Sequence, residues 1–123
     1  MTDNIDHPSH YTGRNVGYEC IDITQYQTFC AGNAIKYLWR YKDKGNPVED
    51  LKKARWYATR ASQRGEQINV AFGQCSDILL NLITVTYGYE SVAWTGLLQR
   101  KWRIVLSALD MMIKESENDT STH

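Results

Sequence analysis

Basic and aromatic residues alternate along residues 33–60 at spacings that suit the binding of an anion. Lys36 and Arg40 are four residues apart, so on a helix they share one face. A guanidinium can hold two phosphate oxygens, an ammonium adds a point charge, and a nearby aromatic ring can stack on a base. The pattern predicts a site for a phosphate-bearing ligand, with the candidate residues Asn33, Lys36, Tyr37, Arg40, Lys53, Trp56, Tyr57 and Arg60.

The charge of the chain is unevenly distributed. The formal net charge is +0, yet residues 33–64 carry nine Lys or Arg against three Asp or Glu. Such a surplus attracts anions. The same pattern is also typical of a solvated helical face, whose cations would pair with Asp43, Glu49 and Asp50 while the aromatic rings serve as core. The acidic remainder argues against nucleic acid as the partner, because nucleic-acid-binding domains usually carry a broad positive surface.

Two helices are expected to present the candidate residues. Apolar residues recur at three- and four-residue spacings from about Ile21 to Tyr41, which predicts a first helix with Gly32 inside it or at a joint. A second helix should begin after the sequence Gly45-Asn46-Pro47, since these residues suit a helix end, an N-cap and a first helical position. The two helices would form a short hairpin.

The rest of the chain is also expected to be mainly helical. In the second helix, which would end near Gly65, the small-residue stripe Leu51, Ala54, Ala58 and Ala61 lets a neighbour approach closely. Residues 75–87 are interpreted as a buried helix that stops at Gly88, although periodicity alone does not separate a helix from a strand there. A last amphipathic helix, with a core or oligomer face, carries Leu98, Trp102, Val105, Leu109 and Met112.

These elements predict an all-α, mostly α fold, a small helical bundle built on a helical hairpin. An extended N-terminal loop would precede the hairpin, because Pro, Gly, Ser and Thr are frequent in the first twenty residues. We expect one helical domain over residues 1–116 and a disordered polar tail over residues 117–123.

Several classes of site are disfavoured by missing motifs. The three cysteines lack a C-x-x-C spacing, which argues against a zinc cluster or a disulfide framework. Neither a long apolar run nor a signal peptide is apparent, so we expect a cytoplasmic protein without a membrane partner. Walker and dinucleotide fingerprints are also missing, and no cofactor is expected. Any phosphate chemistry would then depend on helical side chains.

The N-terminal segment His7-Pro8-Ser9-His10-Tyr11 has three interpretations. Its two histidines suggest a metal site, but a flexible H-x-x-H outside a helix fixes neither the geometry nor a third ligand, and we expect no metal. Alternatively the segment is a lid, stiffened by Pro8, in which His10 and Tyr11 contact the ligand. An ordinary surface loop is the third interpretation.

Four ordered motifs together resemble the SaV-like family of small bacteriophage and prophage proteins, a domain of unknown function. The resemblance covers roughly residues 5–62. Its motifs are His7-Pro8-x-His10-Tyr11, Glu19-Cys20-Ile21-Asp22, Gly32-Asn33-Ala34-Ile35-Lys36-Tyr37-Leu38-Trp39-Arg40 and Glu49-Asp50-Leu51-Lys52-Lys53-Ala54-x-Trp56-Tyr57.

The resemblance implies a nucleotide ligand. The family includes the C-terminal part of a coliphage kinase that phosphorylates deoxynucleoside monophosphates without a Walker motif or a metal ion. It implies host cytoplasm as the location and ATP as a co-substrate. Its binding residues would be Asn33, Lys36, Tyr37, Arg40, Lys53 and Tyr57, with His10 and Tyr11 closing over the ligand.

Catalysis follows less directly than binding, and no catalytic residue is assigned. The chain lacks the long N-terminal extension of that kinase, and residues 70–117 match none of it. Phosphoryl transfer needs two phosphate sites in line, which a homo-oligomer could complete across an interface. Two alternatives need no turnover: a sponge that sequesters a host nucleotide signal in anti-phage defence, and a protein that binds a macromolecular partner through the basic hairpin.

Overall fold

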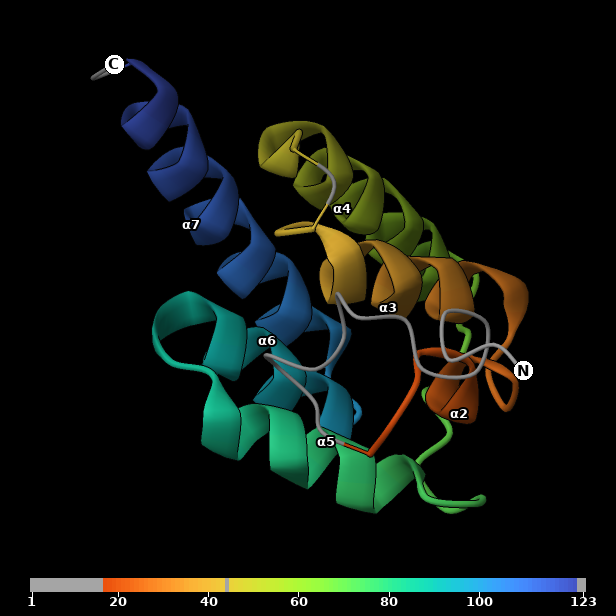
Figure 1. Ribbon diagram of the computed structural model, residues 1–123. Coiled ribbons are helices and arrows are strands. Elements are labelled where there is room, and N and C mark those ends of the chain that lie inside the picture. Colours follow the sequence, from red (N-terminus) through yellow and green to blue (C-terminus); the bar gives the residue numbers. More distant parts are fainter. Residues whose placement is uncertain (1–16, 44, 122–123) are drawn as a thin grey trace.

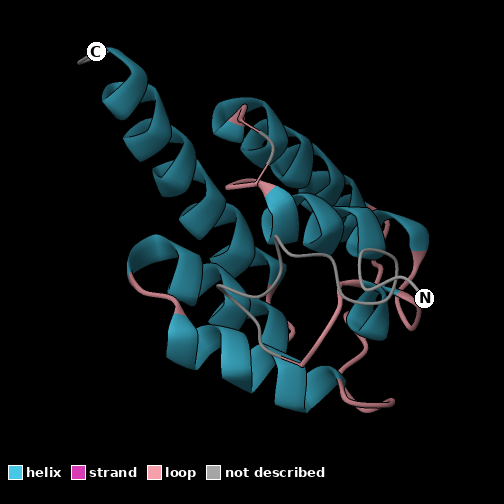
Figure 2. Cartoon of the chain, viewed as in Figure 1, coloured by secondary structure: helices cyan, strands magenta, loops and turns pink. Residues whose placement is uncertain are grey.

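The computed structural model describes residues 17–43 and 45–121 of the chain. Within these residues it contains helices and turns but no strand (Figure 2), which confirms the all-α prediction. The segment expected to form the N-terminal loop lies mostly outside the described residues. The six helices are α2 (Ile21–Thr24), α3 (Phe29–Arg40), α4 (Pro47–Gln63), α5 (Cys75–Val85), α6 (Gly88–Leu98) and α7 (Trp102–Ser121).

The predicted hairpin is formed by α3 and α4. Gly45 adopts a left-handed backbone with φ +80°, and Asn46 follows as the N-cap, its side-chain oxygen accepting a hydrogen bond of 3.2 Å from the backbone N–H of Glu49. Pro47 occupies the start of α4, where no backbone donor is needed. These local signals place the turn where the sequence predicted it.

The helices form two layers joined by α7 (Figure 1). One layer is the α3–α4 hairpin, the other is the α5–α6 pair, and α7 packs on both α4 and α6. The predicted stripe of Leu51, Ala54, Ala58 and Ala61 is fully buried, which lets helices approach α4 closely. The indoles of Trp39 and Trp94 meet edge to face at 6.3 Å, so the two layers share one core.

The first helix is interrupted, contrary to the prediction of a single run from residue 21 to 41. Residues 25–28 separate α2 from α3, and Gly32 lies inside α3. The Gln27 amide donates to the carbonyl of Asn69 at 2.7 Å and accepts from its N–H at 2.9 Å. This long-range contact fixes the break, because a partly buried amide with both of its hydrogen bonds satisfied stabilises a turn that the local periodicity does not favour.

The second half of the chain is divided differently from the prediction. After α5, Gly88 begins a further helix, α6, which the periodicity did not separate. Leu98 ends α6 instead of belonging to the last helix, because Arg100 adopts φ 60° and interrupts the chain before α7. Gly96 permits this sharp connection, since a Cβ there would lie 2.9 Å from side-chain atoms of Ile104 and Val105.

The last helix is longer than expected and packs internally. α7 continues to Ser121, five residues beyond the domain boundary expected at residue 116. An ion pair of 3.1 Å between Lys52 and Glu117 ties this part of α7 to α4. The apolar face of α7, including Val105, Leu109 and Met112, is buried in the core and does not form an open interface. None of the described helices combines the length and the apolar character that a membrane span requires.

Candidate functional site

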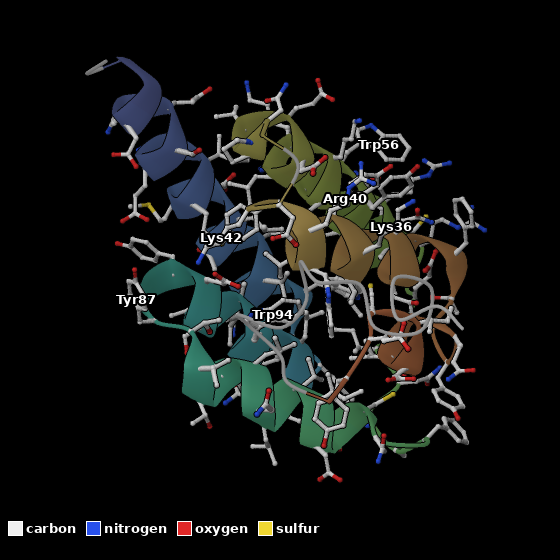
Figure 3. The ribbon with its side chains drawn as sticks, viewed as in Figure 1. Lys36, Arg40, Lys42, Trp56, Tyr87 and Trp94 are labelled. Atoms are coloured by element: carbon white, nitrogen blue, oxygen red, sulfur yellow. The ribbon has the colours of Figure 1, made fainter. Side chains whose placement is uncertain are left out.

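Three cations surround the ring of Tyr37 on the α3–α4 hairpin. The Lys36 Nζ lies 5.0 Å from the ring centroid, the Arg40 guanidinium carbon 4.8 Å, and the Lys53 Nζ 5.5 Å. In Figure 3 Lys36, Arg40 and Trp56 lie together over α3 and α4. The structure therefore brings three of the four predicted basic residues, from both helices, to one aromatic ring, with which they make cation–π contacts.

Arg40 is fixed by a buried carboxylate. Its guanidinium donates two hydrogen bonds to Asp50, 3.3 Å from Nε to Oδ2 and 3.5 Å from Nη2 to Oδ1. The Asp50 side chain is only 4% exposed, whereas that of Arg40 is 31% exposed. The alternative interpretation of the sequence, in which the cations pair with nearby carboxylates, is thus correct for Arg40. The Arg40 side chain nevertheless stays partly exposed to solvent.

The other cations differ in how far they are neutralised. Lys53 lies 3.1 Å from Glu49, and the hydrogen bond to Glu49 raises the pKa of Lys53 above its ordinary value. Among the described residues, Lys36 and Arg60 form no ion pair with a carboxylate. Lys36 and Arg60 are therefore the candidate residues whose charge is most available to an anion.

The aromatic candidates do not all offer a free ring face. Tyr37 and Tyr57 stack on each other, with centroids 5.9 Å apart and planes 7° apart. Trp56 and Phe29 both meet Tyr57 edge to face, at 5.1 Å and 6.1 Å. The residues Trp56 and Phe29 are 61% and 73% exposed. A base would therefore stack on Trp56 or Phe29. The stacked pair of Tyr37 and Tyr57 packs beneath these two exposed rings.

A cavity of about 640 Å³, called here the α2–α3 cavity, contains part of the predicted set. Asn33, Lys36 and Arg40 line it along one side of α3. The Asn33 amide nitrogen donates to the carbonyl of Phe29 at 2.8 Å. Further lining residues from α2, the α2–α3 connection and α3 are Cys20, Ile21, Thr24, Gln27, Thr28, Phe29, Gly32 and Trp39.

Four of the other predicted residues lie in two further depressions, whereas Tyr37 lines none of the three and packs against the core. A cavity of about 520 Å³, called here the Trp56 cavity, is lined by Trp56, Tyr57 and Arg60 together with Thr28, Phe29, Cys30, Arg64 and Glu66. Lys53 lines a third depression near Asn46, also with Trp56. The structure thus divides the predicted groove, and His10 and Tyr11 lie outside the described residues.

Sequence reasoning missed residues that the folded chain brings to the site. Phe29 fits the three- and four-residue apolar spacing that predicts the first helix, yet it is exposed and lines both the α2–α3 cavity and the Trp56 cavity. Thr24 and Gln27 reach the α2–α3 cavity because the chain breaks before α3. Arg64 follows Arg60 by four residues, and this spacing was a signal that could have placed it on the same face.

The described cavities contain neither an activated cysteine nor a cluster of metal ligands. Burial raises the pKa of the Cys20 thiol to about 12, so this cavity-lining cysteine stays protonated at neutral pH. No group of three or more His, Cys, Asp or Glu side chains within residues 17–43 and 45–121 is arranged to hold a metal ion. The two cavities are thus lined mainly by cationic, aromatic, amide and hydroxyl side chains.

The fold and the site define a class: a small helical bundle whose N-terminal hairpin carries a basic, aromatic face. Residues 5–59 match the model of a family described as a protein of unknown function, DUF3310. The match spans α2, α3 and most of α4, and therefore includes Asn33, Lys36, Arg40 and Lys53. No curated protein and no solved structure matches the chain.

Proposed function

We propose that the chain binds a nucleotide, or a closely similar phosphate-bearing small molecule, in the α2–α3 cavity. The observation that carries this proposal is the position of Lys36, which lines the cavity beside Arg40 and forms no ion pair with any described carboxylate. An unpaired ammonium next to a fixed guanidinium is an arrangement that phosphate oxygens satisfy.

The dimensions of α3 fit such a ligand. Phe29 and Lys36 are seven residues apart on one helix, a rise of roughly 10 Å. This length suits a nucleotide whose phosphate contacts Lys36 and Arg40 while its base lies against the exposed ring of Phe29. The cavity volume of about 640 Å³ lies within the range of small-molecule sites. Asn33 lies between the two ends and lines the same cavity.

The resemblance to phage proteins supports the nucleotide as the ligand and the cytoplasm of an infected bacterium as the place of action. It also suggests phosphoryl transfer from ATP. That reaction requires donor and acceptor phosphates in line, whereas a sponge requires binding alone. Incubation with ATP and each deoxynucleoside monophosphate, followed by separation of the products, distinguishes a kinase from a sponge.

Binding itself is tested by native mass spectrometry with a panel of nucleoside mono-, di- and triphosphates. We expect a stoichiometric complex that weakens in Lys36→Ala and in Arg40→Lys, which keeps the charge but loses the planar fork. Arg40→Ala is a poorer choice because it leaves the buried Asp50 unpaired. Absence of any nucleotide complex, with the variants and wild type equally folded, would reject the proposal and leave a partner-binding protein.

The same spectra report the oligomeric state. A homo-oligomer was expected from the apolar face of the last helix, but that face is packed in the core. The apolar side chains exposed on the described surface of α5 and α6 are instead Leu80, Val85, Tyr89 and Val92. A homo-oligomer would therefore use a surface other than the predicted one.

A further inference from the structure

The α2–α3 cavity and the Trp56 cavity adjoin each other at the start of α3. Thr28 and Phe29 line both cavities. The Phe29 side chain projects between them, 73% exposed, and its ring rests edge to face on Tyr57. Because the two cavities share these residues, one ligand can extend across Phe29 from one cavity into the other.

The Trp56 cavity has recognition chemistry of its own. Arg60 forms no ion pair with a described carboxylate, and Arg64 is 59% exposed although it lies 3.8 Å from Glu66. Glu66 is the single carboxylate among the described lining residues, and its Oε1 accepts hydrogen bonds from Thr28 Oγ1 and from the backbone N–H of Ala31. Two cations against one engaged carboxylate leave this cavity positive.

An aromatic platform accompanies these cations. The indole of Trp56 is 61% exposed, and its contact with Tyr57 holds it edge-on at 5.1 Å. A held, exposed indole next to arginines favours a base together with a phosphate, because phosphate alone gains nothing from the ring. The two cavities therefore repeat one chemistry: a cationic group and an exposed aromatic ring, Lys36 with Phe29 and Arg60 with Trp56.

We propose that the ligand is a dinucleotide, in which two nucleotide units joined through phosphate occupy the two cavities and the linkage crosses Phe29. This inference rests on the nucleotide-binding function proposed above and names its ligand class. Each volume, about 640 Å³ and about 520 Å³, suits one nucleotide unit. A mononucleotide leaves one ring and its cations without a partner, so the second unit adds affinity through its local concentration.

The test compares a 5′-phosphorylated dinucleotide with the matching mononucleotide by calorimetric titration. The wild type is expected to bind the dinucleotide about tenfold more tightly or better, since stacking of one further base contributes at least this factor. Trp56→Ala and Arg60→Ala should each remove most of this advantage, so that the ratio of dinucleotide to mononucleotide affinity falls toward one. Arg103→Ala, an exposed arginine on α7, is the matched control and should retain the full advantage.

The outcomes separate this inference from the function on which it rests. The dinucleotide proposal is overturned if the two ligands bind with equal affinity. It is also overturned if the dinucleotide still binds more tightly than the mononucleotide in both Trp56→Ala and Arg60→Ala. Either result leaves the proposal of mononucleotide binding intact. Binding of neither ligand overturns the nucleotide-binding function as well. Affinity that keeps rising through oligonucleotides of increasing length overturns the two-unit ligand in favour of single-stranded nucleic acid.

Discussion

Asp50 lies beneath Arg40, with its Oδ2 3.3 Å from the guanidinium Nε. The carboxylate is almost fully buried in the α3–α4 hairpin, while the guanidinium reaches the lining of the α2–α3 cavity. The same guanidinium lies over the Tyr37 ring. Arg40 is thus oriented from two sides before any ligand arrives, and this preorganisation reduces the entropy that binding must overcome.

Asp50→Asn tests this relationship. Loss of the charged partner should lower the free energy of unfolding by about 1–3 kcal/mol, as measured by urea denaturation, because the buried hydrogen bonds to Arg40 weaken. Nucleotide affinity should fall as well, since the guanidinium is no longer held. Glu49→Gln, which alters the exposed pair with Lys53, serves as the control and should cost less than about 1 kcal/mol. Equal stability of Asp50→Asn and wild type would show that the pair does not hold the site.

Glu66 gives the fold a specific pH dependence. Burial raises the pKa of the Glu66 carboxyl, but hydrogen bonds from Thr28, Ala31 and Cys30 outweigh it, and the pKa lies below its ordinary value of 4.5. Because the pKa is lower in the folded state than in the unfolded chain, the ionised Glu66 carboxylate stabilises the folded state fully above pH 4.5. This stabilisation disappears as the pH falls through the folded-state pKa.

Glu66→Gln should therefore destabilise the protein by about 1 kcal/mol at pH 7, from the loss of charge-assisted hydrogen bonds at the start of α3. The difference between variant and wild type should shrink as the pH is lowered below 4.5. Thermal unfolding at several pH values measures this difference in stability. Glu115→Gln, which alters an exposed carboxylate, is the reference variant. A difference that is independent of pH would contradict the assignment of the lowered pKa to this carboxyl.

The Cys20 thiol should be unreactive although it lines the α2–α3 cavity. With its pKa raised to about 12, the thiolate fraction at pH 8 is at least a hundredfold lower than that of an unfolded cysteine. Iodoacetamide should thus label Cys20 far more slowly in native protein than in urea, as followed by peptide mass spectrometry. Rapid native labelling of this residue would place the thiol in a more polar environment than the structure shows.

Local signals predicted the hairpin, but contacts distant in sequence decided the rest of the fold. Gly45, Asn46 and Pro47 act within one turn, so their pattern was sufficient. The break before α3 depends on the contact between Gln27 and Asn69, 42 residues apart, which periodicity does not report. The interruption at Arg100 likewise requires a left-handed arginine, a conformation that its residue type does not favour.

In the candidate site, as in the fold, the sequence predicted local groupings of residues but not the arrangement that depends on packing between helices. Helical spacing correctly grouped Lys36 and Arg40, since residues four apart share a face. The division of the predicted groove into separate cavities was not predictable, because it depends on how α2 and α4 pack against α3. The exposure of Phe29 is a further case. Its apolar side chain fits the helical stripe in the sequence, and only the folded chain shows that it is 73% exposed.

Titration of the wild type and of Lys36→Ala with nucleoside monophosphates is the most direct test of the central claim. Lys36 is exposed and pairs with no described carboxylate, so its removal should change the free energy of unfolding by no more than about 0.5 kcal/mol. We expect the variant to bind at least about tenfold more weakly, while Lys114→Ala on α7 binds like wild type. Equal affinity of the wild type and Lys36→Ala for every nucleotide bound would contradict the assignment of phosphate binding to the α2–α3 cavity.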